Sequence, residues 1–425
     1  MRLIRSVVMK KKVWIINHYA SDMFFNKGGR HYWIAEQLKK NGYEPVIFCS
    51  NAKHDELSNF VDFDGLYEEI IDENSCVKYV FVKTRLHKGN GFSRMLNMFS
   101  FFKNVKKTIR KYSKINGKPD VIIGSSVHPL SCVAGIQLSK KFKCECISEI
   151  RDLWPEEIVS YSKKWKDTDL IIRLLYRGER WIYKKSNKII FLQEGAYDYI
   201  LEKKWDNVIP REKVFYLNNG IDLTMFNYNK QVYQYVDDDL LNKQYINLVY
   251  TGSIRMVNNL GIILDTAKLL IDSNVRFLIW GSGDQVEYLK NRCLVENIGN
   301  VIFKGKVEKK YIPSIVSQSS ANILHWEMSR DLKYGPSYNK MFEYLASGNP
   351  IISTLQTPYS IIKKYGCGVS SDSNTPESIA SKIRDFISLN ESDISLMKEH
   401  SIEAAKHFDF KVLTNELIKI IEKDF

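Results

Sequence analysis

The sequence predicts an α/β protein made of two doubly wound, Rossmann-like domains that face each other across a cleft. Three observations support this prediction. The 425 residues exceed what one ordinary core holds. Short apolar segments alternate with amphipathic ones, as in parallel sheets covered on both faces. The alternation also begins a second time after residue 218. We expect an N-terminal domain over 1–205, a C-terminal domain over 206–405, and a binding cleft between them.

The first series opens with an apolar strand and continues through loop and helix in repeated units. Its expected strands are 12–19, 44–50, 119–126, 143–150 and 187–193, with helices at 29–43 and about 130–141. The second series repeats the order, and two final amphipathic segments are expected to close the chain as helices. Its expected strands are 245–252, 275–281, 300–305, 320–326 and 350–354, with helices at 258–273, 284–296 and 337–348.

Composition narrows the classes of function. Seven cysteines lie scattered without metal-ligand spacing, which favours buried thiols in a reducing cytosol. No apolar run approaches the roughly 18 residues of a membrane span. The net charge is +13, and residues 1–200 carry all of it, with 35 basic and 22 acidic residues against 27 of each in the remainder. The first half is therefore expected to meet an anionic partner.

Residues 83–118 hold eleven lysines and arginines and no acidic residue, with bulky apolar side chains between them. This pattern predicts a basic amphipathic helix. A core-packed helix with a solvated basic rim is the alternative interpretation. We favour an anionic membrane surface as the partner, and no nucleic acid, because no nucleic-acid-binding motif accompanies the charge.

Three loops of the first half follow the carboxyl ends of expected strands. Gly28 and Gly29 open a helix, an arrangement that suits anions. His128 stands in "SSVHPL", between a strand and a helix, and Arg151 and Asp152 follow the next strand. The alternatives are a plain helix entry, a structural histidine and a charged turn with a local ion pair.

Two glycine-bearing loops follow strands of the second half. In "YTGSIRM", Gly252 allows close approach of a ligand to the backbone, and Arg255 can clasp a phosphate. Gly281 and Gly283 stand in "WGSGDQV", which lacks the remaining glycine of the dinucleotide fingerprint. A tight strand–helix turn and a solvated arginine are the alternatives.

The stretch "SYNKMFEYLASGNPII" predicts a helix from Ser337 to Gly348. Lys340 lies in its first turn, where the helix dipole disfavours cations. A simple surface pair of Lys340 with Glu343 is one explanation. An anion docked at the N–H groups of this turn is the other, because the lysine and the dipole would then hold it together.

Taken in order, these motifs resemble the retaining glycosyltransferases of the GT-B fold, family 4. The likeness is greatest to the bacterial branch that builds O-antigen, capsule and other surface polysaccharides. It begins at Lys12 and covers almost the whole chain. The resembling stretches include "INHYASDMFFNKGGRHYWIAEQL", "PDVIIGSSVHPL", "EIRDLWPEE", "NNGIDLTMF", "YTGSI", "IWGSGDQ" and "SYNKMFEYLASGNPII".

The resemblance implies a donor site in the C-terminal domain, an acceptor site in the N-terminal domain, and a final helix over 406–425 that crosses back to the first domain. It implies no metal site and no cofactor beyond the nucleotide-sugar substrate. Gly335 stands where relatives carry the first glutamate of an E-x7-E pattern, and Ser253 and Asn258 stand where many carry an arginine and a lysine. The implied diphosphate ligands are Gly252, Arg255, Ser337, Asn339 and Lys340. The implied nucleoside ligands are Glu343, Gly281, Gly283, Lys306 and Val307. The implied acceptor-side residues are Gly28, Gly29, Arg30 and Arg151, and the implied catalytic residues are His128 and Asp152.

The expected function is transfer of a hexose or N-acetylhexosamine from a UDP- or GDP-sugar to a lipid-diphosphate-linked glycan. Such an enzyme is expected in the cytoplasm, peripheral on the inner face of the cell membrane. Two alternatives stay open. One is a nucleotide-sugar 2-epimerase of the same fold, which needs no acceptor. The other is a catalytically silent subunit that binds a partner transferase, motivated by the glycine at 335.

Overall fold

The computed structural model describes residues 11–89, 91–126, 128–161, 165–327 and 329–423. The chain forms two compact units. Unit 1 runs to Asn218 and resumes at Leu413, and unit 2 runs from Asn219 to Val412. Unit 1 thus extends past the boundary expected at residue 205, because a short strand after that residue joins its sheet. The returning segment likewise begins at Leu413 rather than at 406.

Unit 1 is built on an eight-stranded sheet of order β3-β4-β2-β1-β5-β6-β7-β8. All pairings are parallel except that of β3 with β4. The chain leaves β1 toward β2 on one side and later returns to β5 on its other side, so β1 and β5 flank a topological switch point. The strands are β1 (Lys12–Ile16), β2 (Glu44–Ser50), β3 (Tyr67–Ile71), β4 (Lys78–Val82), β5 (Val121–Ser125), β6 (Glu145–Ile150), β7 (Lys188–Phe191) and β8 (Val214–Tyr216).

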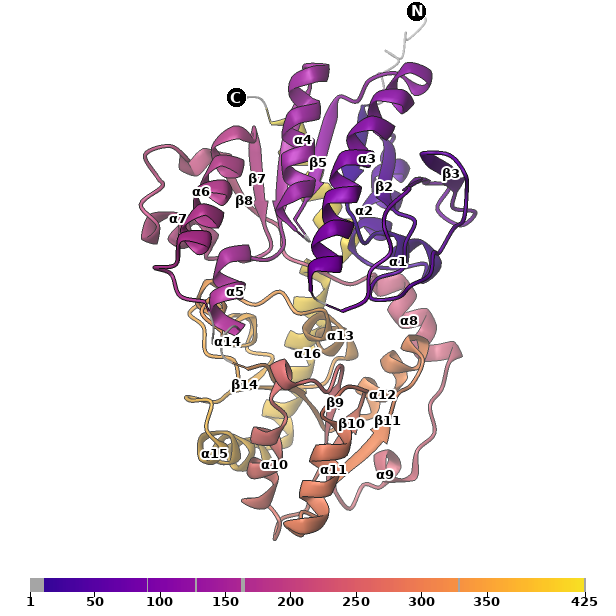
Figure 1. The fold of residues 1–425 in the computed structure, drawn as a ribbon. Helices are drawn as coiled ribbons and strands as arrows, with labels where there is room; N and C mark the ends of the chain where they lie inside the picture. The colour runs from indigo at the N-terminus through magenta and orange to yellow at the C-terminus, as the bar shows by residue number, and fades with distance from the viewer. Residues whose placement is uncertain (1–10, 90, 127, 162–164, 328, 424–425) are drawn as a thin grey trace, which may run out of the picture. The chain divides into compact units, whose positions relative to one another are not determined.

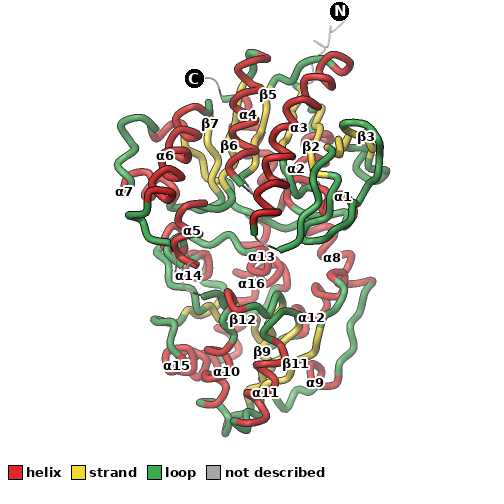
Figure 2. Tube along the Cα trace, viewed as in Figure 1, coloured by secondary structure: helices red, strands yellow, loops and turns green. Residues whose placement is uncertain are grey.

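The helices of unit 1 lie on both faces of this sheet (Figures 1 and 2). Right-handed crossovers place α3, α4 and α6 on one face and α2 on the other. Helix α4 packs against both α3 and α6, so these three form one layer. The helices are α1 (Ser21–Phe25), α2 (Arg30–Lys40), α3 (Phe92–Asn116), α4 (Pro129–Phe142), α5 (Trp154–Tyr161), α6 (Leu170–Lys185), α7 (Ala196–Glu202) and α17 (Phe410–Glu422).

The expected basic helix exists as α3, and its two faces differ. Phe101, Val105 and Ile109 are buried in the core against the sheet. Phe92 and Phe99 are exposed, as are most of the basic side chains. No helix within the described ranges is both long and apolar enough to span a membrane.

Unit 2 is built on a six-stranded, wholly parallel sheet of order β11-β10-β9-β12-β13-β14. Its switch point lies between β9 and β12, where the strand order reverses. The near-continuous burial of these strands reflects helices on both faces. The strands are β9 (Ile246–Thr251), β10 (Val275–Trp280), β11 (Val301–Gly305), β12 (Ala321–Leu324), β13 (Ile351–Ser353) and β14 (Gly368–Ser370).

Two apolar cores sandwich the sheet of unit 2. One joins α12, α13 and α16 to the sheet, and the other joins α10 and α15 to its opposite face. Helix α13 begins at Asn339 rather than at the expected Ser337 and ends before Gly348, whose φ is +77°. The helices are α8 (Leu223–Val232), α9 (Asp238–Leu241), α10 (Gly261–Lys268), α11 (Val286–Val295), α12 (Ile312–Gln318), α13 (Asn339–Ser347), α14 (Ile361–Tyr365), α15 (Pro376–Ile387) and α16 (Glu391–His407).

Candidate functional site

Lys340 is a buried cation at the switch point of unit 2. Its side chain runs from the first turn of α13 toward the end of β9, where its Nζ donates to the Tyr250 hydroxyl at 2.7 Å. The ammonium also lies 4.1 Å from the centroid of the Tyr250 ring. No carboxylate in the described part of the chain forms an ion pair with it. Burial lowers the pKa of Lys340 to about 7, and Glu343 offsets this only in part. A buried charge without a counter-ion is costly, so this position favours an anionic ligand.

The N-terminus of α13 adds partial positive charge beside this lysine. Tyr338 is the N-cap residue, and no side chain caps the helix. The first-turn N–H groups of an α-helix have no partner within the helix. The Ser337 Oγ, just before the helix, is buried without a hydrogen-bond partner among the described residues. The exposed Asn339 is bonded by the Asn219 amide. The sequence-predicted Ser337, Asn339 and Lys340 thus share one helix entry suited to an anion.

The two glycine loops of unit 2 lie against each other, backbone on backbone. A Cβ on Gly281 would stand 1.8 Å from the Gly252 carbonyl oxygen, and one on Gly283 would stand 2.1 Å from the Ile254 oxygen. The Ile254 N–H donates to the Ser282 carbonyl at 2.9 Å. The close packing of the two backbones is by itself enough to require glycine at positions 281 and 283. Gly252 has a different neighbour, because a Cβ there would stand 3.0 Å from Lys340 Nζ.

Glu343 lies one turn along α13 from Lys340 and is partly buried. Burial raises the pKa of its carboxyl, against the charges of Lys309 and Lys340. Its carboxylate has no hydrogen-bond partner within the described residues. It is therefore available to ligand hydroxyl groups.

The remaining unit 2 residues predicted from sequence are more exposed. Arg255 lies in the loop after β9 with an exposed side chain. Lys306 is exposed after β11, and Val307 is half-buried against the apolar core. The structure therefore brings Lys340, Gly252 and the entry of α13 together, and leaves Arg255 and Lys306 on the surface.

The backbone conformation explains the glycine at position 335. Gly335 ends a short 3-10 turn, η4 (Leu332–Tyr334), with φ +111°. This conformation favours glycine and would strain a glutamate. Ser253 and Asn258, the other two departures, bond each other through Ser253 Oγ and Asn258 Oδ1 at 2.9 Å. A neutral side-chain pair thus occupies positions 253 and 258.

In unit 1, His128 stands at the switch point and is paired with a second histidine. It is the N-cap residue of α4 and is 1% exposed. Its Nε2 lies 2.7 Å from Nδ1 of His18, in the loop after β1. Burial, together with the charge of Arg94, lowers the pKa of His128 to about 3. The imidazole is therefore neutral at physiological pH, able to orient a hydroxyl group but not to carry a charge.

Arg30 is buried within a closed ionic network. Its Nε bonds Glu149 at 2.7 Å, and its other nitrogens donate to the Leu217 and Asn218 carbonyls at 3.1 and 2.6 Å. Glu149 also lies 2.9 Å from His31. Burial alone would raise the pKa of Glu149, but Arg30 and His31 hold it well below its usual value. The guanidinium of Arg30 is thus engaged inside unit 1.

The other unit 1 residues predicted from sequence line the same edge of the sheet. Gly29 is the N-cap of α2 with φ +109°, preceded by the half-buried Gly28. Arg151 and Asp152 follow β6 and are also half-buried. The backbone of Arg151 is fixed by Ser126 Oγ at 3.1 Å and by Gln193 Nε2 at 2.9 Å.

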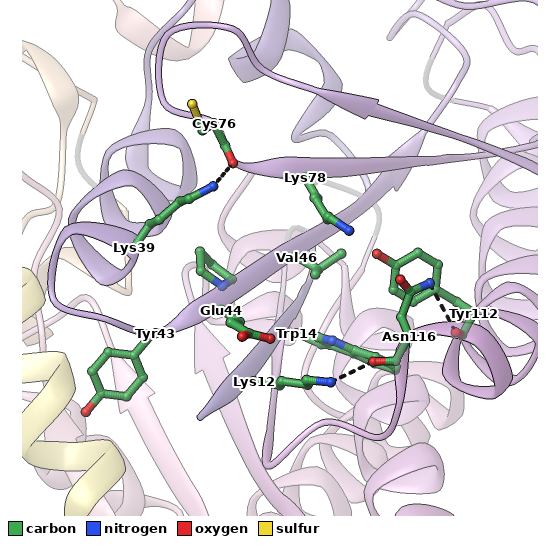
Figure 3. A pocket seen from close by; sticks show the side chains of 11 residues that line it. Lys12, Trp14, Lys39, Tyr43, Glu44, Val46, Cys76, Lys78, Tyr112 and Asn116 are labelled. Atoms are coloured by element: carbon green, nitrogen blue, oxygen red, sulfur yellow. Dashed lines mark hydrogen bonds between the residues drawn. The ribbon is translucent and has the colours of Figure 1, made fainter. Parts of the chain in front are cut away.

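A pocket of about 380 Å³ lies at the opposite edge of the unit 1 sheet, at the amino ends of β1, β2 and β4 (Figure 3). Trp14 and Tyr112 contribute aromatic walls, and lysines surround them. Lys12 donates to the Asn116 carbonyl at 2.7 Å, and Lys39 donates to the Cys76 carbonyl. Both ammonium groups thus donate hydrogen bonds to backbone carbonyls. The carbonyl of Asn116 lies at the end of α3. Because ligands of doubly wound sheets bind beyond the carboxyl ends, we do not assign the pocket to the main activity.

Sequence reasoning missed two residues of these sites. Tyr250 is part of an expected strand, and nothing in the strand pattern shows that its hydroxyl meets Lys340. His18 follows the first strand directly, as His128 follows a later one, and that repeated position was an available signal. Across the described ranges, no group of three or more histidine, cysteine or acidic side chains is arranged to hold a metal ion.

Comparisons with known proteins agree with this architecture. The family model "Glycosyltransferase Family 4" matches residues 32–225, and "Glycosyl transferases group 1" matches residues 246–388. No curated protein matches the sequence.

Solved structures match almost the full length of the chain at low sequence identity. Sucrose-phosphate synthase from Thermosynechococcus elongatus is 13% identical, with a TM-score of 0.69 over 97% of this chain and 98% of its own. Anabaena HepE in complex with UDP-glucose is 12% identical, with a TM-score of 0.61 over 96% and 99%. WaaG, a glycosyltransferase involved in lipopolysaccharide biosynthesis, is 12% identical, with a TM-score of 0.60 over 97% and 100%. At this identity the likeness shows the fold, which is GT-B.

Proposed function

Because the chain is a glycosyltransferase of the GT-B type, we propose that it transfers a hexose or N-acetylhexosamine from a UDP- or GDP-sugar to a lipid-diphosphate-linked glycan of a surface polysaccharide. The observation that carries the proposal is the buried ammonium of Lys340. It has no carboxylate partner among the described residues and lies at the entry of α13, at the switch point of unit 2. A nucleoside diphosphate supplies the missing negative charge.

The proposed donor site follows from this single anchor. The diphosphate accepts from Lys340 and from the first-turn N–H groups of α13, with Gly252 allowing its close approach. Glu343 accepts from the ribose hydroxyls. Support comes from HepE, whose solved structures contain UDP and UDP-glucose.

The proposed reaction breaks the bond between the sugar and the diphosphate, and negative charge develops on the leaving phosphate. Lys340 and the helix dipole stabilise that charge. We propose transfer with retention at the anomeric carbon, in which the departing phosphate takes the proton of the acceptor hydroxyl. His128 and Asp152 orient the sugar and the acceptor. Because Lys340 and the helix dipole stabilise the leaving phosphate in this proposal, chelation of metal ions is expected to leave the transfer rate unchanged.

The acceptor side of the proposal rests on the helix layer of unit 1. Seven lysines and arginines lie on α3, two on α4 and five on α6. The single acidic residue of these helices, Glu179, is buried. Leu170, Leu174 and Trp181 are exposed on α6, and Phe92 and Phe99 are exposed on α3. A basic surface with exposed bulky apolar groups suits an anionic membrane, where a lipid-linked acceptor resides.

Incubation with a panel of nucleotide sugars tests the reaction. One UDP- or GDP-sugar is expected to be hydrolysed slowly without acceptor and faster with a lipid-diphosphate glycan. A product that is the 2-epimer of the donor would replace the transferase with an epimerase. Binding of neither UDP nor GDP, with no change on Lys340→Ala, would favour a silent subunit.

Sedimentation with vesicles containing anionic lipid tests the membrane surface separately. The triple variant Lys103→Gln, Lys107→Gln and Arg110→Gln removes exposed charge from α3 and is expected to weaken binding about tenfold or more. The matched control removes three exposed lysines of unit 2, Lys243, Lys290 and Lys398, and is expected to bind like the wild type. Equal binding of both triple variants would remove the membrane argument. Donor hydrolysis is expected to persist in both.

A further inference from the structure

The ring of His18 is held rigidly at the switch point of unit 1. The ring is completely buried and is stacked between two aromatic rings. Its centroid lies 4.3 Å from the ring centroid of Phe101 and 4.5 Å from that of Tyr19. The ring of His128 meets it edge-on, with an angle of 88° between the planes. The two histidines follow β1 and β5, which are neighbouring strands. Stacking on both faces leaves the His18 ring little freedom to turn away from His128.

The bond between the two rings couples their protons. His18 Nδ1 and His128 Nε2 are 2.7 Å apart, so one nitrogen carries the hydrogen and the other accepts it. Protonation of both rings would place two donors against each other. The pair therefore stays neutral, or singly charged at most. Within a neutral pair, the tautomer of one ring dictates the tautomer of the other.

The surroundings keep the pair neutral. Burial lowers the pKa of both imidazoles, and the further groups that act on them are Arg94, His54 and His87. None of these is a carboxylate, so nothing among them favours a positive imidazole. Phe101 and Tyr19 cover the His18 ring with uncharged faces. The pair differs in this respect from His31, which contacts the carboxylate of Glu149.

The outer nitrogens of the pair lack partners. His18 Nε2 and His128 Nδ1 are buried without a hydrogen-bond partner among the described residues, as are Tyr19 Oη and His87 Nδ1 nearby. Each such unsatisfied buried group is unfavourable in the folded protein. Several of them in one cluster indicate a place where a ligand or water completes the bonding. In a neutral pair, one outer nitrogen bears hydrogen and the other is bare, which matches a sugar hydroxyl that both donates and accepts.

We propose that His18 is a positioning residue that fixes the tautomer and orientation of His128, so that the outer nitrogen of His128 holds a sugar hydroxyl in one defined hydrogen bond. The role of the hydroxyl rests on the proposed transferase function, whereas the coupling of the two rings does not. No bond is formed or broken and no proton leaves the pair. His18 acts only through His128.

Two substitutions separate this role from simple packing. His18→Asn places an amide near the Nδ1 position, where it can still bond His128 Nε2. His18→Leu fills similar space without a polar atom. We expect kcat to fall about tenfold or more in His18→Leu and to recover most of its value in His18→Asn, while the KM for the donor stays unchanged in both. Equal kcat in the leucine variant and the wild type would overturn the proposal.

Long-range proton–nitrogen spectra of the histidine rings give a readout that needs no substrate. In the wild type at pH 7, His128 is expected in the neutral tautomer that complements His18, with one hydrogen between the two facing nitrogens. In His18→Leu it is expected as a mixture of two, with the melting temperature and UDP binding of unit 2 as folding controls. A single unchanged tautomer in His18→Leu would refute the coupling. Coupled rings in a protein without transferase activity would refute only the proposed function.

Discussion

The switch points of the two units hold buried nitrogen bases that differ in how readily they take up a proton. In unit 2, Lys340 has a pKa of about 7 and lies beside a helix N-terminus, so it readily carries a charge when an anion arrives. In unit 1, His128 has a pKa of about 3 and is bonded to a second neutral ring. Both are buried and both lack a carboxylate partner in the described part of the chain.

The difference follows from what each base is paired with. Tyr250 accepts a hydrogen bond from Lys340 and presents its ring to the ammonium, which partly supports the charge. Burial and the charge of Arg94 both oppose a charge on His128, which is bonded to a second imidazole. The buried cation of Arg30 differs from Lys340, because the carboxylate of Glu149 already compensates its charge. The comparison supports the proposed anion site in unit 2 and the proposed hydroxyl site in unit 1.

The largest expected effect, on stability, comes from disrupting the packing of the two glycine loops of unit 2 against each other. Gly281→Ala places a Cβ 1.8 Å from the Gly252 oxygen, at a φ of +157°. Neither backbone can move easily, so we expect a loss of about 3 kcal/mol or more in the free energy of unfolding. Urea unfolding measures it. Gly299→Ala, which meets nothing within 4 Å, is the control and is expected to change stability little. Equal stability of the two variants would show that the loops are not locked together.

Removal of the buried charge is expected to abolish the anion site. Lys340→Met keeps the length and the apolar stem but not the ammonium. We expect UDP affinity to fall about 100-fold, or about 2.7 kcal/mol, by calorimetry. Lys290→Met removes an exposed lysine of α11 and is expected to bind UDP like the wild type. Full UDP binding by Lys340→Met would remove the basis for the donor site.

The neutral histidine predicts sensitivity to acid. The unfolded chain binds a proton at His128 below its usual pKa of about 6.5, whereas the folded protein does so only near pH 3. Stability is therefore lost as the pH falls below 6.5, by about 2 kcal/mol from this group between pH 7 and pH 5. His128→Asn is expected to reduce the measured pH 7 to pH 5 difference by that amount. His407→Asn, an exposed substitution on α16, is expected to leave it unchanged.

The smallest expected effect is the pH dependence of donor binding. In the proposed donor site Lys340 holds the diphosphate in its protonated form, and its pKa without ligand is about 7. Raising the pH from 7 to 8.5 is expected to weaken UDP binding about tenfold, because a growing fraction of the lysine is neutral. Calorimetry at pH 8 in two buffers is expected to show uptake of nearly one proton. Affinity independent of pH over this range would contradict a titrating lysine.

Much of the fold was predictable from local pattern. The segments before Asn17 and before Gly252 were predicted as strands because they are nearly continuous apolar runs, as expected in a covered sheet. Strand β3 was missed because its Glu68 and Glu69 break the apolar run, and its antiparallel pairing leaves it at the edge. Strand β8 was missed because three residues carry too little periodicity to detect.

The sequence by itself determined the alternation of strands and helices, the asymmetry of charge and the unusual Lys340 at a helix entry. Those properties depend on neighbours along the chain, where periodicity and helix signals operate. Only the tertiary structure decided that Lys340 meets Tyr250, that His18 pairs with His128, and that Arg30 is enclosed by Glu149. These pairs join residues 90, 110 and 119 positions apart. Burial and partner choice at such separations are set by strand order, which no local pattern encodes.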